Sequence, residues 1–235
     1  MNLFRFSAVR HIQRQVADPA MWPKLTPNFP VGCKRILVSN DWYPALQKPN
    51  VELVTKGIKE IREHSIVTND NVEHELDCII FGTGFYATDN PIAGIIYGRD
   101  GRQLSQVWKN GEEAYLGATV HGFPNFFFIV GPNVTLGHSS MVYMIETQVQ
   151  AISRILLEAD AKNAATVEVK LDVQQTYNEK LQKILGGSVW ATCCDSWYKH
   201  RSGKITQLWP GFTFTFRRWN KKFNSPDYIF NATNK

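Results

Sequence analysis

The sequence predicts an α/β protein, in which helices pack around strands buried inside the molecule. Three observations carry this prediction. The apolar run "FFFIV" (126–130) is typical of a strand buried on both faces, and residues 141–156 then place apolar side chains at helical spacing after an N-cap at Ser139 or Ser140. A second amphipathic helix is expected over residues 173–185, with Asp172 as its N-cap and a glycine pair as its stop.

The remaining elements are shorter. Residues 1–16 resemble an amphipathic helix with Phe4, Val9, Ile12 and Val16 on one side, and the proline-rich stretch that follows cannot form a long helix. Strands are expected over residues 35–39, 51–55, 114–120 and 126–130, in the run 72–81, and through much of the tail after residue 188. Asn69, Asp70 and Asn71 predict a hairpin turn between two β-rich runs.

Composition excludes several classes of protein. The chain has 235 residues, a net charge of +5 and 43% hydrophobic residues, with Lys and Arg spread too evenly for a nucleic-acid-binding stripe. No apolar run approaches the ~20 residues needed to span a bilayer, and the N-terminus lacks a signal peptide's apolar segment. The four cysteines fit a reduced, cytoplasmic protein.

The stretch "DCIIFGTGFY" (77–86) leaves two interpretations open. Gly82 and Gly84 either end a strand in a tight turn, or let the backbone approach a dinucleotide at a strand's carboxyl end. The third glycine of G-x-G-x-x-G is absent, and no helical pattern follows. The stretch therefore does not itself predict a phosphate-binding loop.

The stretch "GPNVTLGHSS" (131–140) precedes the long helix, so it either presents free helix N–H groups to a ligand or is shaped for packing alone. His138 contacts a ligand or helps to cap the helix. Lys34 and Arg35 clamp a phosphate or are surface charge. No metal-ligand spacing, nucleophile motif or Walker loop is present, and Cys193-Cys194 is a vicinal pair without C-x-x-C spacing.

Taken in order, five motifs resemble one family. They are the segment 18–55 with its "GCKR", then "DCIIFGTGF", "YLGATVHGFPNFFFIVGPNVTLGHSSMVYMIE", "VWATCCDSWY" and "LWPGFTFTFRR". Together they are similar to the C-terminal half of a flavin-dependent monooxygenase of the Baeyer–Villiger or flavin-containing type. The resemblance runs from about residue 8 to about residue 230.

The resemblance implies a Rossmann-like fold with two dinucleotide-binding domains, one for FAD and one for NADPH. NADPH would reduce FAD, and O₂ would then give a C4a-peroxyflavin that inserts oxygen into a ketone or oxidises an amine or sulfide. Residues 1–32 would be a remnant of a helical insertion. Residues 33–80 would complete the NADPH domain, and residues 81–235 the FAD domain.

The resemblance also assigns site residues. Lys34 would bind the NADPH 2′-phosphate, Arg35 would stabilise the peroxyflavin anion as the catalytic residue, and Trp197 would touch NADP. The residues expected near the flavin are Gly82, Thr83, Gly84, Gly131, Pro132, His138 and Ser139. Gly82 stands where the family usually has alanine. No metal is implied.

The family's N-terminal half carries both G-x-G-x-x-G motifs and the F-x-G-x-x-x-H-x-x-x-W fingerprint, and these are missing from the sequence. Without the first βαβ units, the remaining strands would expose edges and apolar faces. The chain alone is therefore expected to bind FAD weakly or not at all, and an N-terminal half could be a separate chain. The alternatives are a non-catalytic remnant or interaction module, and a thiol redox protein using Cys193 and Cys194.

Overall fold

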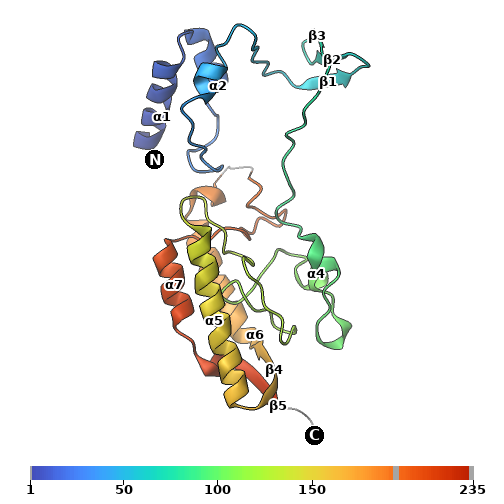
Figure 1. The fold of residues 1–235 in the computed structure, drawn as a ribbon, viewed down its shortest axis with the longest axis vertical. Coiled ribbons are helices and arrows are strands. Elements are labelled where there is room, and N and C mark those ends of the chain that lie inside the picture. The colour runs from blue at the N-terminus through green and yellow to red at the C-terminus, as the bar shows by residue number, and fades with distance from the viewer. Residues whose placement is uncertain (1, 193–195, 233–235) are drawn as a thin grey trace. The chain divides into compact units, whose positions relative to one another are not determined.

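The computed structural model describes residues 2–192 and 196–232. The chain divides into two compact units, one formed by Met1–Val31 with Ile36–Phe85 and the other by Gly32–Arg35 with Tyr86–Lys235. Figure 1 traces the chain through both. The chain therefore passes from the first unit to the second after residue 31, returns after residue 35, and passes to the second unit again after residue 85.

The first unit begins with helices. It contains α1 (Asn2–Gln15), the 3₁₀ turn η1 (Pro19–Met21), α2 (Trp22–Leu25) and α3 (Trp42–Ala45). Ile12 and Val16 are buried as the helical pattern predicts, whereas Phe4 is 72% exposed. The Gln47 side chain joins the end of α1 to the segment after α3, accepting from the Ala17 N–H at 2.8 Å and donating to the Gln15 carbonyl at 2.7 Å.

A small antiparallel sheet follows in the same unit. Strands β1 (Ile58–Ile61), β2 (Ser65–Thr68) and β3 (Glu73–Glu75) pair in the order β1-β2-β3. The turn between β2 and β3 contains Asn71 with φ at 62°, a conformation that asparagine tolerates better than most residues. The predicted hairpin is confirmed.

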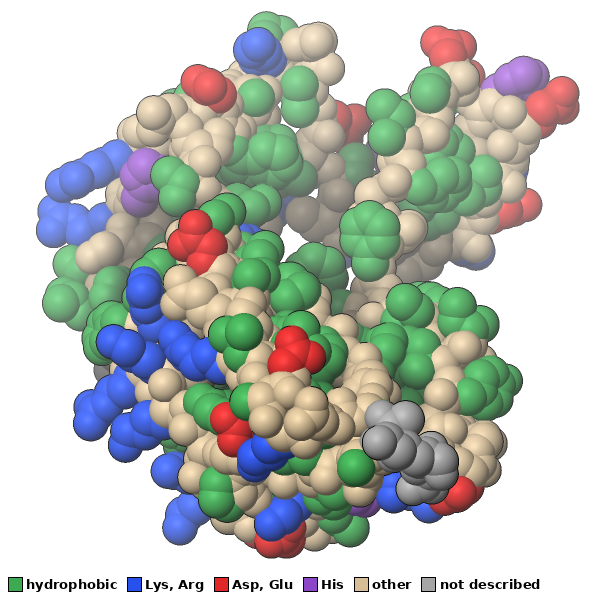
Figure 2. Space-filling view, turned by 60° about the horizontal axis from the view of Figure 1, so that its bottom comes forward, with side chains coloured by type: hydrophobic (Ala, Val, Ile, Leu, Met, Phe, Trp, Pro, Cys, Tyr) green, Lys and Arg blue, Asp and Glu red, His purple; other side chains and the backbone are tan. Residues whose placement is uncertain are grey.

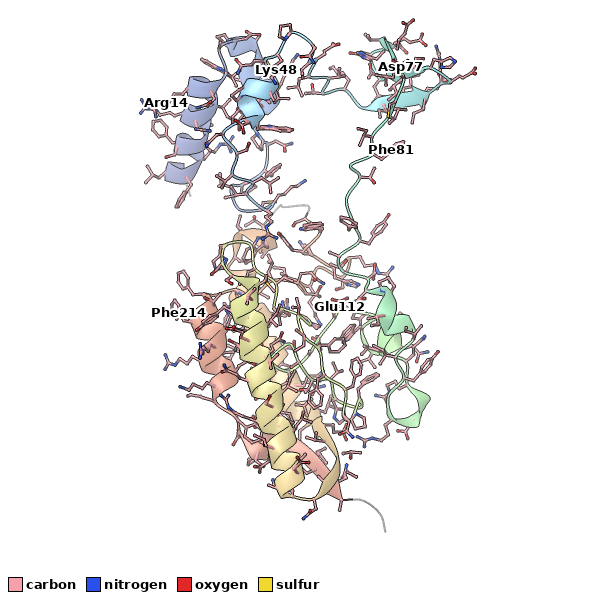
Figure 3. All side chains as sticks on the ribbon, viewed as in Figure 1. Arg14, Lys48, Asp77, Phe81, Glu112 and Phe214 are labelled. Atoms are coloured by element: carbon pink, nitrogen blue, oxygen red, sulfur yellow. The ribbon has the colours of Figure 1, made fainter. Side chains whose placement is uncertain are left out.

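Two other predicted strands of this region are wrong, and the predicted run 72–81 is confirmed only at its start, where β3 lies. The segments 35–39, 51–55 and 77–81 join no ladder among the described residues. Their apolar side chains face solvent: Leu37 is 84% exposed, Val38 95% and Ile80 91%, and Figure 3 shows Phe81 on the bare extended trace. A strand needs a neighbour to take up its backbone hydrogen bonds, and the described chain supplies none here.

The second unit holds the larger core. Its elements are η2 (Pro91–Gly94), η3 (Arg99–Gly101), α4 (Leu104–Val107), α5 (Met141–Ala161), β4 (Ala164–Val169), α6 (Leu171–Gly186), η4 (Val189–Ala191), α7 (Thr213–Lys221), η5 (Ser225–Asp227) and β5 (Tyr228–Ala232). In Figure 1, α7 runs beside α5, and β4 pairs with β5 antiparallel at its lower end. The main core cluster joins Met144 of α5, Leu181 of α6 and Phe216 of α7, all fully buried.

Both long helices predicted from periodicity are confirmed. The Ser140 hydroxyl caps α5 by accepting from the Tyr143 N–H. The expected cap of α6 is wrong, because Lys170 holds the N-cap position and Asp172 lies in the first helical turn. An acidic residue there still favours the helix, since it faces the positive end of the helix dipole.

Three further predictions of strands fail in this unit. Residues 114–120 form only an isolated bridge, and residues 126–130 are half-buried coil with no ladder partner among the described residues. Residues 213–221 form helix α7, although "FTFTF" alternates like a strand. Phe216 and Asn220 are both buried and are four residues apart, so they lie on the same face of the helix. Burial of that face favours the helix over a strand.

The secondary structure is therefore mixed, as predicted, but the described residues form two antiparallel sheets and no parallel one. None of the described helices is long and apolar enough to cross a membrane. The cytoplasmic location stays a prediction.

Candidate functional site

The 131–139 loop leads into α5 and is fixed by hydrogen bonds to residues 205–208. The Asn133 N–H donates to the Thr206 carbonyl at 2.7 Å. The Asn133 side-chain amide donates to two further carbonyls, at 2.8 and 3.0 Å, and Thr135 donates its N–H and its hydroxyl to a third. Two segments some 70 residues apart in sequence thus define the path of this loop.

Gly131 lies where two stretches of backbone meet closely. A Cβ added at Gly131 would come within 2.3 Å of the Gly117 carbonyl oxygen and 2.8 Å of the Phe128 Cβ. Gly117 is equally confined: its φ is +66°, and an added Cβ would meet a Val134 methyl at 2.1 Å. Only glycine fits at either position without a shift of backbone or core side chains.

The last residues of the loop are open to solvent at the N-terminus of α5. His138 and Ser139 are exposed, while Ser140 caps the helix. The His138 ring lies edge-on to the Phe212 ring, with centroids 6.3 Å apart. Because a helix presents free N–H groups in its first turn, this end of α5 can donate hydrogen bonds to an electron-rich group.

A cavity of about 300 Å³ borders the beginning of the loop. Its lining combines apolar side chains with polar surface of about equal extent and includes Phe126, Phe127, Phe128, Gly131, Pro132, Asn90, Glu112 and Gln207. A second cavity of about 290 Å³ shares Asn90, Trp108 and Glu112 with the first. Both volumes lie at the small end of the range found for small-molecule sites.

Glu112 is the carboxyl common to both cavities, and it is only 6% exposed. Its oxygens accept from the Gln207 side-chain amide at 2.8 Å and from the Asn90 N–H at 3.3 Å. Figure 3 places it between α4 and the loops behind α5. Burial raises the pKa of Glu112 to about 7; the two hydrogen bonds oppose that rise, and the nearby carboxylate of Asp89 adds to it.

The Gly32–Arg35 segment belongs to the same unit as the loop. The Trp190 indole donates to the Gly32 carbonyl at 3.0 Å, which holds the segment beside η4. Cys33 is buried, and the side chains of Lys34 and Arg35 are exposed.

The cysteines differ from the prediction. Cys33 is disulfide-bonded, so the expectation that all four are reduced is wrong, whereas Cys78 is free and exposed. Cys193 and Cys194, the pair considered for thiol redox chemistry, lie outside the described residues.

Trp197 also lies in this unit. Its side chain is 47% exposed, and its ring lies 5.8 Å from that of the buried Tyr198. Trp197, the Gly32–Arg35 segment and the 131–139 loop are thus parts of one unit.

The "GTG" residues belong to the other unit, Met1–Val31 with Ile36–Phe85. Gly82, Thr83 and Gly84 are all exposed on extended chain. Gly84 has φ at +84°, which favours glycine, whereas a Cβ at Gly82 would meet nothing within 4 Å. The structure therefore explains the second glycine, and it gives no reason why Gly82 could not be alanine.

Comparisons with known proteins identify relatives of the chain. No family model matches it. It is 46% identical over 235 residues to a Baeyer-Villiger monooxygenase of Pseudomonas aeruginosa, covering 99% of this chain and 45% of the relative. It is 37% identical over 238 residues to an FAD-binding monooxygenase of Aspergillus niger, covering 98% of this chain and 39% of that protein.

Among solved structures, an oxidized steroid monooxygenase bound to NADP aligns with a TM-score of 0.88 at 27% identity. The alignment covers 98% of this chain and 45% of that one. The chain corresponds to the C-terminal part of a flavin-dependent monooxygenase. It spans about 45% of the length of the Pseudomonas relative.

Within this monooxygenase segment, sequence reasoning missed Glu112 and Gln207. Neither lies in a recognisable motif, and the two are 95 positions apart in the sequence, so only the fold brings them together. One clue was present, because "GEEAY" places two carboxyls directly before a predicted strand. Which of the two becomes buried is a tertiary property that the pattern does not encode.

Glu112 predicts a pH dependence of stability. Its ordinary pKa is 4.5 and its pKa in the folded protein is about 7, so the folded state holds its proton more tightly. The stabilisation of the folded state by the protonated Glu112 is fully present below pH 4.5 and is lost as the pH rises through 7. Urea unfolding at pH 5 and pH 8 should therefore show a loss of roughly 2 kcal/mol in the unfolding free energy of the unmodified chain.

In Glu112→Gln this loss should disappear, because the amide cannot ionise. Glu146→Gln, an exposed carboxyl on α5, is the matched control and should keep the unmodified pH dependence. An equal pH dependence in Glu112→Gln and the unmodified chain would show that Glu112 titrates in its ordinary range.

Proposed function

We propose that the chain supplies one side of the FAD site, together with NADPH-contacting residues, of a monooxygenase that inserts one atom of O₂ into a ketone or oxidises an amine or sulfide. FAD would supply the activation of oxygen and NADPH the electrons. The chain's own residues would hold the cofactors and stabilise charge. One relative is named for FAD binding, and one structural neighbour was solved with NADP.

The observation that carries the proposal is the 131–139 loop with the cavity at one end and the exposed start of α5 at the other. Gly131 and Pro132 line the cavity, and Glu112 and Gln207 provide its polar groups. Hydroxyl groups of a cofactor could donate to the Glu112 carboxylate or accept from an amide there. At about 300 Å³ the cavity suits only part of a dinucleotide, which fits a site completed by other residues.

Lys34, Arg35 and Trp197 would serve NADPH and the reaction. The exposed Lys34 ammonium would pair with the 2′-phosphate, and the Trp197 ring, half exposed, would cover the bound nucleotide. The Arg35 guanidinium would stabilise the negative charge that develops on oxygen. Gly82, Thr83 and Gly84 would line the flavin from the chain that leaves the first unit.

The same proposal assigns the domains and a partner. Residues 1–32 would belong to a helical insertion, residues 33–80 to the NADPH domain and residues 81–235 to the FAD domain. The exposed runs around Leu37 and Ile80 would add strands to a nucleotide-binding half that carries the glycine-rich loops, either in the same polypeptide or in a separate one.

A second function, a non-catalytic interaction module, is favoured by one observation. Apolar side chains lie open to solvent over much of the surface in Figure 2, as on proteins that bind others. Such a module would bind a nucleotide-binding half without forming a working flavin site.

Oxygen incorporation separates the two functions. The chain is co-expressed with the part of the Pseudomonas relative that it does not match, and the purified mixture receives FAD, NADPH, a ketone or sulfide and ¹⁸O₂. We expect one ¹⁸O atom in the organic product. A stable complex that gives no product from ketones, amines or sulfides would favour the module instead.

A further inference from the structure

Helix α5 is apolar around about half of its circumference, but its own unit covers only part of that surface. The side that faces the unit's core holds Met144, Ala151, Ile155 and Ala159, all buried. Beside it runs a second row of apolar residues. We refer to this row as the α5 stripe; it consists of Val142, Ile145, Val149, Ile152 and Leu156.

The α5 stripe is open to solvent along its length. Val142 is 64% exposed, Val149 48% and Leu156 47%, and the two isoleucines between them are half-buried. Figure 1 shows α5 along the front of its unit, with α7 on one side and no other element drawn over it. A helix with apolar residues on so wide a face is ordinarily buried on all of it.

The spacing of the α5 stripe indicates what kind of element fits it. Val142, Val149 and Leu156 are seven residues apart, and the isoleucines fall three residues after the first two. This alternation of three and four is the pattern by which one helix packs along another. A sheet would instead need a broader, flatter surface.

We propose that the α5 stripe is the docking surface for an amphipathic helix of the nucleotide-binding half. The inference rests on the proposed function. Two observations favour that occupant over a second copy of the chain. About 55% of the Pseudomonas relative lies outside the matched region, and α5 starts directly after the 131–139 loop, so a helix on the stripe would border the same cofactor site.

A charge placed in the stripe should disrupt the docking. Val149→Glu puts a carboxylate at its centre, and Gln150→Glu, one residue along on the exposed polar side, adds the same charge outside it. Each variant is co-expressed with the unmatched part of the Pseudomonas relative, and the complex is measured by size-exclusion chromatography with light scattering. We expect Val149→Glu to weaken the complex at least tenfold and Gln150→Glu to leave it within twofold of the unmodified chain.

Three results would overturn the proposal: no complex with the unmodified chain, equal effects of the two substitutions, or a dimer of the chain itself that Val149→Glu dissociates. Helicity and thermal unfolding of the two variants alone should match, since Val149 is half exposed. Bound flavin is recorded separately. A stripe-dependent complex without flavin supports the docking surface and counts against the proposed function.

Discussion

Arg35→Ala is expected to lower oxygenated product by roughly 10²- to 10³-fold in the assembled enzyme, while NADPH still reduces the flavin. The guanidinium is exposed at the end of the Gly32–Arg35 segment, and its removal leaves the buried neighbour Cys33 untouched. Electrons would then pass to oxygen without reaching the substrate. Flavin reduction is followed anaerobically by absorbance, and product by chromatography.

Lys34→Ala is the matched control, because it removes the adjacent exposed cation. It should raise the KM for NADPH and narrow the enzyme's preference for NADPH over NADH. The amount of product formed per NADPH consumed should not change. Product at the unmodified level from Arg35→Ala would refute the assignment. An equal loss of product in both variants would show a general need for positive charge.

Gly131→Ala is expected to destabilise the second unit by about 2 kcal/mol or more. The added methyl group would lie 2.3 Å from the Gly117 carbonyl oxygen, and neither stretch of backbone can move freely. The neighbouring Asn133 is tied to the 205–208 segment on the far side of the loop. Urea unfolding followed by tryptophan fluorescence measures the change.

Gly137→Ala is the control for this prediction. A Cβ at Gly137 meets nothing within 4 Å, and its backbone is not in the left-handed region, so the change should cost nothing and could stabilise by up to ~1 kcal/mol. Equal stabilities for the two variants would show that the contact between Gly131 and Gly117 relaxes without cost.

Local patterns predicted the elements that need no distant partner. Helix α5 follows from its own period and its Ser140 cap, and the β2–β3 hairpin from the Asn-Asp-Asn turn. The strands around Leu37 and Ile80 were wrongly predicted because a strand forms only against a neighbour, and the described chain has none for them.

In the tail, a strand was predicted where the chain forms helix α7. The alternation of "FTFTF" favours a strand, but Phe212 and Phe214 remain exposed, their rings stacked 5.2 Å apart, while Phe216 enters the core. Tertiary burial of one phenylalanine, together with Asn220 one helical turn later, outweighs the local pattern.

The residues of the candidate site that lie in sequence motifs could be predicted. Those that only the fold brings together could not. The 131–139 loop was identified from its place between an apolar run and a helix. Glu112 was not, since an isolated carboxyl gives no sign of the burial that raises its pKa to about 7. The closeness of Gly131 to Gly117 likewise joins residues that no local pattern connects.

The most direct test of the central claim is a titration with FAD, followed by quenching of flavin fluorescence. The chain alone should bind FAD weakly or not at all, and the chain assembled with the unmatched part of the Pseudomonas relative should bind it tightly, with one flavin per complex. Tight binding by the chain alone would contradict the account, and so would an assembled complex that binds no flavin.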